Sequence, residues 1–144
     1  MSKILVVDDS KMIRLLLTQS IMGLGYETIE ASNGKEALEI LKTESDKIKL
    51  ILLDWNMPEM NGYEFLQIMR ENNTYKNLQV MMVTTEGERV HVIKALKFGV
   101  SNYLTKPFTP EDIATKVYEC LGLPEDDLSL NRLDELNIKK EDDL

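Results

Sequence analysis

The sequence of 144 residues has very few of the side chains that bind soft metals or form disulfides. It contains one cysteine, Cys120, and one histidine, His91. A lone cysteine cannot form a disulfide within the chain, and this pair cannot complete a zinc site of the usual Cys/His kind. The sequence therefore argues against a disulfide-linked fold and against thiol or zinc chemistry.

Long hydrophobic runs are also lacking. No uninterrupted apolar run exceeds five residues, whereas a membrane-spanning helix needs about 18. The opening residues MSKILVVDD carry charge too early for a secretory signal. We expect a cytoplasmic protein with no membrane insertion.

Positive charge is the third shortage. Lys and Arg number 17 against 25 Asp and Glu, which gives a net charge of −8. Nucleic-acid binding depends largely on clustered Lys and Arg, so we expect no nucleic-acid partner. The excess of acid is greatest in residues 124–144, and the rest of the chain is nearly balanced.

What the sequence does contain is a regular alternation of short apolar runs and helical patterns. Runs typical of strands occupy residues 3–8, 26–31, 50–53, 80–84 and 101–105. Helical patterns cover residues 12–24 and 89–97, and three more helices are expected to begin at 33–36 (NGKE, with capping-box spacing), 61–64 (NGYE) and 109–112 (TPED). This alternation predicts an α/β fold with one doubly wound, five-stranded parallel sheet and five helices.

Polar residues stand where several of these strands end. Asp8 and Asp9 follow the first strand, Asp54 follows the third, Thr84 ends the fourth and Lys106 follows the fifth. Ligands of such folds bind at the carboxyl ends of the strands. Three converging carboxylates repel one another unless one is protonated or a cation lies among them. An all-oxygen ligand set favours Mg²⁺, with Mn²⁺ as an alternative.

These residues suit phosphoryl transfer. A carboxylate held in line with a phosphoryl donor can form an acyl phosphate, because this reaction depends mainly on positioning and charge neutralisation. Lys106 would contribute a positive charge, and the Thr84 hydroxyl could donate to a phosphoryl oxygen.

Four motifs give the chain a resemblance to a known family. They are LVVDD at 5–9, LLDWNMPEMNG at 52–62, VTTE at 83–86 and NYLTKPF at 102–108. With these motifs the chain resembles the receiver domains of response regulators in two-component signalling, most closely the CheY-like chemotaxis type. The resemblance covers about residues 2–122, which makes 1–122 the receiver domain. It implies the flavodoxin-like strand order 2-1-3-4-5.

The resemblance also implies a role for each residue at the site. Asp54 would be the phosphoacceptor. The Mg²⁺ ion would be bound directly by Asp9 and Asp54, through water by Asp8, and by the backbone carbonyl of Asn56.

Four further residues receive roles from the same resemblance. Thr84 and Lys106 would contact the phosphoryl group, and Thr84 and Tyr103 would form the conformational switch. Asn56 and Glu86, each two residues beyond a site residue, would tune the loss of the phosphate. Pro107 would follow a cis peptide bond.

The resulting hypothesis is a single-domain response regulator that is a phosphoacceptor and not a conventional enzyme. It would take a phosphoryl group from a histidine kinase onto Asp54 and signal to a protein partner, such as the flagellar motor switch. A phosphorelay carrier or kinase-regulating adaptor would use the same chemistry. A Mg²⁺-dependent phosphatase acting through an aspartyl phosphate is a weaker alternative, because such enzymes usually have an acid where this chain has Asn56.

The acidic tail, residues 123–144, departs from the family pattern. Leu130, Leu133 and Leu136 recur there at helical spacing, so the tail is either disordered or forms a short amphipathic helix. It could lie across the last helix or join two subunits.

Overall fold

Strands and helices alternate strictly along residues 2–122, the part of the chain that the computed structural model describes. The strands are β1 (Lys3–Val7), β2 (Glu27–Ala31), β3 (Ile48–Leu53), β4 (Val80–Thr84) and β5 (Asn102–Thr105). The helices are α1 (Lys11–Met22), α2 (Gly34–Glu44), α3 (Gly62–Glu71), α4 (Arg89–Lys97) and α5 (Pro110–Leu121).

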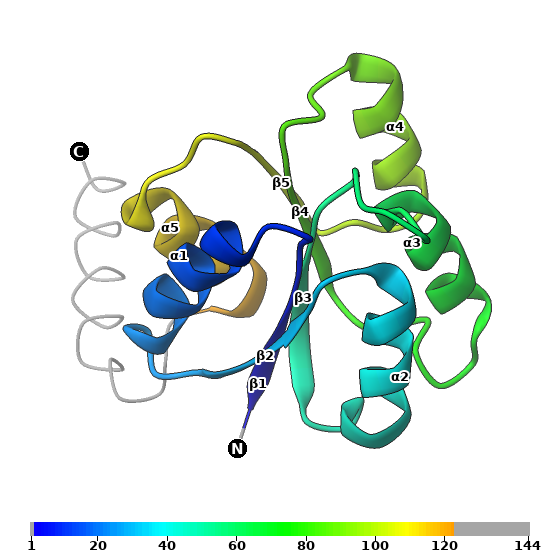
Figure 1. Ribbon diagram of the computed structural model, residues 1–144, viewed down its shortest axis with the longest axis horizontal. Coiled ribbons are helices and arrows are strands. Elements are labelled where there is room, and N and C mark those ends of the chain that lie inside the picture. The colour runs from blue at the N-terminus through cyan, green and yellow to red at the C-terminus, as the bar shows by residue number, and fades with distance from the viewer. Residues whose placement is uncertain (1, 123–144) are drawn as a thin grey trace, which may run out of the picture.

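The strands form one parallel sheet in the order β2-β1-β3-β4-β5. In Figure 1, α1 and α5 lie on one side of this sheet, and α2, α3 and α4 lie on the other. The predicted doubly wound fold, its strand order and its five helices are therefore confirmed.

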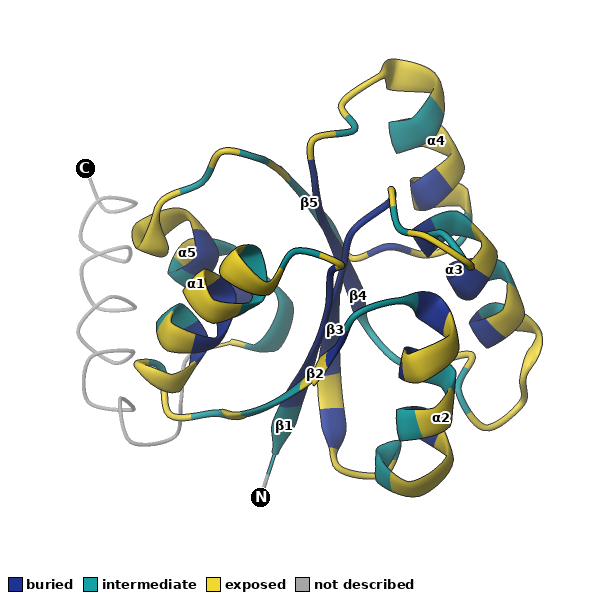
Figure 2. Cartoon of the chain, viewed as in Figure 1, coloured by how far each residue is buried: buried dark blue, intermediate teal, exposed yellow. Residues whose placement is uncertain are grey.

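Two hydrophobic cores form because successive side chains of a strand point to opposite faces of the sheet. On β1, Ile4 and Val6 belong to the core under α1 and α5, whereas Leu5 and Val7 belong to the core under α2, α3 and α4. All four are essentially inaccessible to solvent, and Figure 2 shows buried residues concentrated along the central strands. Burial on both faces explains why these strands read as continuous apolar runs.

Four helices begin at a side chain that accepts a hydrogen bond from a backbone N–H three residues later. These N-caps are Ser10, Asn33, Asn61 and Thr109. The caps of α3 and α5 are complete capping boxes. The expected box of α2 is half formed, because the Glu36 carboxylate accepts from the Ser32 hydroxyl instead of from Asn33.

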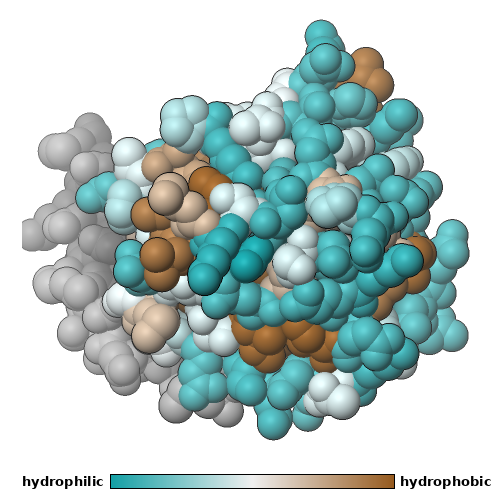
Figure 3. All heavy atoms as spheres, viewed as in Figure 1, coloured by the Kyte–Doolittle hydropathy of each residue, from teal (hydrophilic) through white to brown (hydrophobic). Residues whose placement is uncertain are grey.

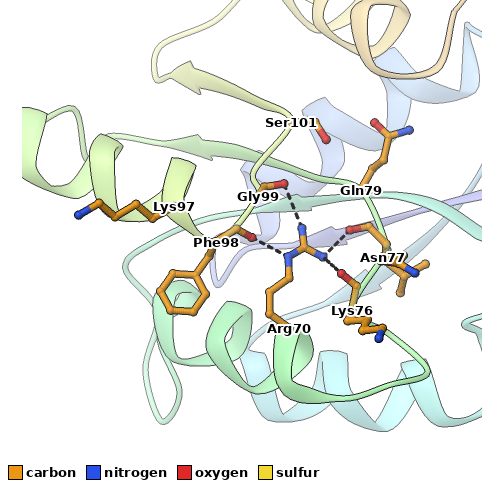
Figure 4. A pocket seen from close by; sticks show the side chains of 9 residues that line it. Arg70, Lys76, Asn77, Gln79, Lys97, Phe98, Gly99 and Ser101 are labelled. Atoms are coloured by element: carbon orange, nitrogen blue, oxygen red, sulfur yellow. Dashed lines mark hydrogen bonds between the residues drawn. The ribbon is translucent and has the colours of Figure 1, made fainter.

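Arg70 joins the end of α3 to two neighbouring turns. Its guanidinium donates to the carbonyls of Phe98 (2.6 Å), Leu78 (2.7 Å), Lys76 (2.9 Å) and Gly99 (3.2 Å), as Figure 4 shows for the hollow that it lines. Partial burial lowers the pKa of Arg70. The guanidinium is thus engaged by backbone oxygens and stabilises this corner of the fold.

None of the helices within residues 2–122 has the length and apolar character needed to cross a bilayer. The predictions for residues 123–144 lie outside the described residues.

Candidate functional site

The carboxyl edge of the sheet collects the polar residues that the sequence places after its strands. Asp8 follows β1, Asp54 follows β3, Thr84 ends β4 and Lys106 follows β5. Because β1, β3, β4 and β5 are consecutive neighbours in the sheet, these residues meet although up to 98 positions separate them in sequence.

Three carboxylates lie close together at this edge. Asp8, Asp9 and Asp54 each offer an oxygen, and these oxygens lie within 4.8 Å of one another. Asp8 and Asp54 are 1% and 5% exposed, whereas Asp9 is exposed. An all-carboxylate set with one solvent-facing member fits a hard divalent cation that retains water ligands, such as Mg²⁺.

Lys106 bridges two of these carboxylates. Its ammonium nitrogen lies 2.7 Å from Asp8 Oδ2 and 3.2 Å from Asp54 Oδ2. Burial acts to lower the pKa of Lys106, but the hydrogen bond to Asp8 and the charges of both aspartates outweigh it, so the pKa is raised. The amine is therefore held in its charged form.

Asp8 is the carboxylate most affected by its surroundings. Burial raises its pKa above 3.8, and the negative charge of Asp54 acts in the same direction. The hydrogen bonds from Lys106 and from the backbone N–H of Ser10 oppose this shift without cancelling it. Two nearby acids thus share one compensating cation, which leaves the cluster short of positive charge.

The Thr84 hydroxyl lies between two loops. It is fully buried, and its oxygen accepts hydrogen bonds from the backbone N–H groups of Trp55 (3.4 Å) and Glu86 (3.2 Å). A movement of this hydroxyl would therefore break hydrogen bonds with the loop that follows Asp54 and with the loop that precedes α4.

Tyr103 contacts the second of these loops. Its hydroxyl donates to the backbone carbonyl of Glu86, and its half-buried ring packs against the core under α4. Burial, assisted by the negative charges of Glu86 and Asp54, raises the pKa of Tyr103 to about 12. Thr84 and Tyr103 thus both form hydrogen bonds with the backbone of Glu86, Thr84 with its N–H and Tyr103 with its carbonyl.

The loop after Asp54 is shaped by a close backbone contact. The backbone N–H of Asn56 donates to Asp54 Oδ1 (3.4 Å), and the N–H of Gly62 donates to the carbonyl of Trp55 (2.8 Å). A Cβ atom on Gly62 would lie 2.1 Å from the carbonyl oxygen of Asp54. Only glycine allows α3 to begin this near the site.

An aromatic stack covers the outer side of this loop. The Trp55 ring is 7% exposed and lies between Tyr63 (5.2 Å between centroids) and His91 (4.8 Å). His91 Nδ1 also lies 2.8 Å from Glu86 Oε1, and this contact lowers the pKa of Glu86. No sequence motif gave His91 or Tyr63 a role at the site, because they reach Trp55 only through the packing of α4 and α3 in the folded chain.

The structure brings Asp8, Asp9, Asp54, Thr84 and Lys106 to one edge, with Asn56, Glu86 and Tyr103 in the adjoining loops and strand. The Lys106–Pro107 peptide bond is cis. A parallel 2-1-3-4-5 sheet whose carboxyl edge presents three carboxylates and a lysine defines a receiver-type α/β domain.

The family model described as response regulator receiver domain matches residues 4–118. The chain belongs to this family, which places it in two-component signalling.

Its similarity to known proteins extends to chemotaxis proteins. The chain is 46% identical over 121 residues to the chemotaxis protein CheY1 of Helicobacter pylori, a match that covers 83% of this chain and 97% of that protein. It is 44% identical to a CheY homologue of Campylobacter jejuni, with 83% and 92% covered.

Solved structures show the same likeness. The structure of chemotaxis protein CheY4 of Vibrio cholerae superimposes with a TM-score of 0.75 at 34% identity, covering 83% of this chain and 98% of the other. The chain also matches a CheX–CheY complex with BeF₃ and Mg²⁺ from Borrelia burgdorferi, with a TM-score of 0.77 and 30% identity over 81% of this chain and 87% of the matched one.

Proposed function

We propose that the protein is a single-domain response regulator that accepts a phosphoryl group on Asp54 from the phosphohistidine of a histidine kinase. The observation that carries this proposal is the position of Lys106 between Asp8 and Asp54, with Asp9 beside them. This arrangement offers a nucleophilic carboxylate and positive charge at one point of the sheet edge.

The transfer forms one bond and breaks one. An oxygen of the Asp54 carboxylate attacks phosphorus, the P–N bond of the donor phosphohistidine breaks, and its electron pair stays on the imidazole. Lys106, already within hydrogen-bond reach of Asp54, would neutralise charge on the transferred group. The Thr84 hydroxyl, whose oxygen accepts from the backbone N–H of Trp55, would donate its proton to a phosphoryl oxygen.

The carboxylates of Asp8, Asp9 and Asp54 would hold a Mg²⁺ ion, with the carbonyl of Asn56 as a further ligand, and Mn²⁺ has the same ligand preferences. When bound, the ion supplies charge neutralisation for the phosphoryl oxygens. Asp9 faces solvent and leaves the cluster open on the side from which a donor would approach.

The signal would travel through residues that already contact the site. When Thr84 moves to the phosphoryl group, its oxygen would no longer accept from the N–H groups of Trp55 and Glu86, and the Glu86 carbonyl also accepts from the Tyr103 hydroxyl. The loop before α4 and the Tyr103 ring would then shift together, toward a conformer that phosphorylation favours.

The surface altered by this shift would be formed by α4, β5 and α5. α4 exposes Val90, Ile93 and Leu96 to solvent, and Lys94 and Lys97 lie among them. Such a mixed apolar and basic face suits a protein partner. Because the similar proteins named above act in chemotaxis, the proposed partner is the flagellar motor switch and the proposed location is the cytoplasm.

The phosphate would then be lost by hydrolysis, with Asn56 and Glu86 flanking the path of the water. A phosphorelay carrier would use the same site and differs only in its partners. A phosphatase of small substrates is less well supported, because the exposed residue two places after Asp54 is Asn56 and offers no general acid.

Incubation with acetyl phosphate and Mg²⁺, followed by intact mass measurement, tests the proposal. We expect one phosphoryl group on the native chain and on an Asp46→Asn control, and none on Asp54→Asn. Equal labelling of the Asp54→Asn variant would refute the assignment of Asp54. Multiple turnover of a phosphomonoester would favour the phosphatase.

A further inference from the structure

The outer face of α1 carries an apolar stripe that the proposed function does not use. Met12, Leu15, Leu16 and Met22 are 71%, 53%, 46% and 64% exposed. Their spacing places them along one side of the helix. In Figure 3, hydrophobic atoms gather over α1.

The stripe continues into a hollow beside the start of α5. This hollow has a volume of about 240 Å³ and is lined by Leu16, Gln19, Ser20, Phe108 and Pro110. Contiguous apolar surface of this kind on a water-exposed helix indicates a binding surface. Within residues 2–122 nothing covers it, in contrast to the inner face of α1, where Leu17 and Ile21 are buried.

The chain itself supplies a segment with matching properties. After Gly122, residues 123–144 follow, and their leucines include Leu130, Leu133 and Leu136 at spacings of three residues. This segment has a net charge of −5, whereas α1 contains no acidic residue and two basic ones, of which Arg14 is paired with Glu30 and Lys11 is exposed. The leucine pattern of the segment therefore complements the apolar stripe of α1, and its negative charge complements the basic side of α1.

The end of α5 lies where such a segment would have to start. Leu121 packs in the same core cluster as Leu24 and Tyr26, the residues that follow α1. Because α1 and α5 pack side by side and both run away from the carboxyl edge, the described chain ends near the C-terminal end of α1. From there the chain can turn back along α1 toward Met12.

The length of the segment is sufficient for this path. A helix of 12 residues such as α1 is about 18 Å long, and about 12 helical residues running back along it would span the whole stripe. Residues 123–144 provide these residues and several more for the turn at each end.

We propose that residues 123–144 fold back along α1 of the same chain and cover its apolar stripe, with Leu130, Leu133 and Leu136 facing Met12, Leu15, Leu16 and Met22. The acidic residues of the segment then face solvent and Lys11. This proposal is independent of the phosphoryl chemistry, because none of the stripe residues belongs to the acid–lysine cluster.

Methionine oxidation tests the contact in the full chain. Met12 and Met22 are exposed unless the segment covers them, and a Leu133→Asp variant places a charge in the contact without touching residues 2–122. If the segment is docked in about nine-tenths of molecules, peroxide oxidation of Met12 and Met22 should be about tenfold slower in the native chain than in Leu133→Asp. The control Asn131→Asp adds the same charge on the opposite side of the helical pattern and should keep the native rates.

A photo-crosslinking residue in place of Leu15 identifies the occupant. At low protein concentration, crosslinks from this position to peptides of residues 123–144 in the same chain would support the proposal. Crosslinks between two chains would show that a second copy covers α1, and would overturn it. Equal oxidation rates in the native chain, Leu133→Asp and Asn131→Asp would also overturn it.

Discussion

Lys106 compensates the negative charge of two buried carboxylates that would otherwise repel each other. Asp8 and Asp54 are almost inaccessible to solvent, and the Lys106 ammonium lies within 3.2 Å of an oxygen of each. Burial raises the pKa of Asp8, the charge of Asp54 adds to this shift, and the single cation compensates the two acids only in part. The site is therefore built to gain stability from additional positive charge.

Replacing Lys106 with methionine should destabilise the protein in the absence of metal. The substitution keeps most of the side-chain volume and leaves Asp8 and Asp54 without their cation, so the free energy of unfolding at pH 7 should fall by about 2–4 kcal/mol. Urea denaturation measures this change. Lys97→Met, on the exposed face of α4, is the control and should change stability by less than about 0.5 kcal/mol. Equal effects of the two substitutions would contradict the charge compensation of Asp8 and Asp54 by Lys106.

Tyr103 should make the protein sensitive to alkaline pH. Its pKa is raised from 10.0 to about 12, so between these values the folded protein keeps a proton that the unfolded chain has lost. The folded state then binds more protons, and the free energy of unfolding falls as the pH rises through this window. Denaturation of Tyr103→Phe should show a shallower fall between pH 10 and pH 12. Parallel curves for the two proteins would mean that Tyr103 titrates normally.

The residues of the site were predictable because their positions follow from the strand ends. Asp8, Asp54 and Lys106 each stand directly after a predicted strand, and parallel strands bring such positions to one edge. The partners of Tyr103 and Trp55 were not predictable. The carbonyl of Glu86 and the His91 ring reach them only through the tertiary packing of α4, which no local pattern encodes.

At the scale of the elements, apolar runs and helix-capping motifs together predicted every strand and helix of residues 2–122, and the differences lie at the ends. β3 begins at Ile48, two residues earlier than predicted, because the exposed Lys49 interrupts the apolar run while the backbone remains extended. α1 ends at Met22 and not at residue 24, since Gly23 and Leu24 enter a turn. Apolar periodicity identifies an element, but hydrogen bonds at its termini set its bounds.

At the start of α3 the fold requires a residue without a side chain, Gly62, and the sequence pattern alone did not predict this requirement. Replacing it with alanine would place Cβ 2.1 Å from the Asp54 carbonyl oxygen, so either α3 or the backbone of Asp54 must move. We expect Gly62→Ala to lose more than about 2 kcal/mol of stability and to be labelled more slowly by acetyl phosphate.

The matched control for this prediction is Gly23→Ala at the end of α1. Gly23 has right-handed helical dihedrals, and an added Cβ would meet its nearest neighbour at 3.4 Å. The free energy of unfolding of Gly23→Ala should therefore stay within about 1 kcal/mol of the native value, and its labelling by acetyl phosphate should be unchanged. Indistinguishable behaviour of the two alanine variants in urea denaturation and labelling would show that the α3 start tolerates a side chain.

At the scale of the whole molecule, two helical layers hold four strand ends in register at one edge. Asp8 costs stability there, because its burial and the nearby charge of Asp54 raise its pKa and oppose its ionisation. The fold tolerates this cost since its two cores are formed by buried side chains from every strand except the half-exposed β5. Stability and the proposed phosphoryl transfer are thus linked through the charge at this edge.

Mg²⁺ should therefore stabilise the whole domain, and its removal should destabilise it. A cation that binds only the folded state at a hundred times its dissociation constant adds about 2.7 kcal/mol to the free energy of unfolding. Thermal denaturation with Mg²⁺ and with chelator measures the difference, which Asp9→Asn should abolish and the control Asp46→Asn should retain.

Without metal, the raised pKa of Asp8 means that the folded state binds more protons just above pH 3.8, so stability falls as the pH rises through that range. Saturating Mg²⁺ favours the ionised carboxylates and should reverse this slope, whereas an unchanged slope would place the ion away from Asp8.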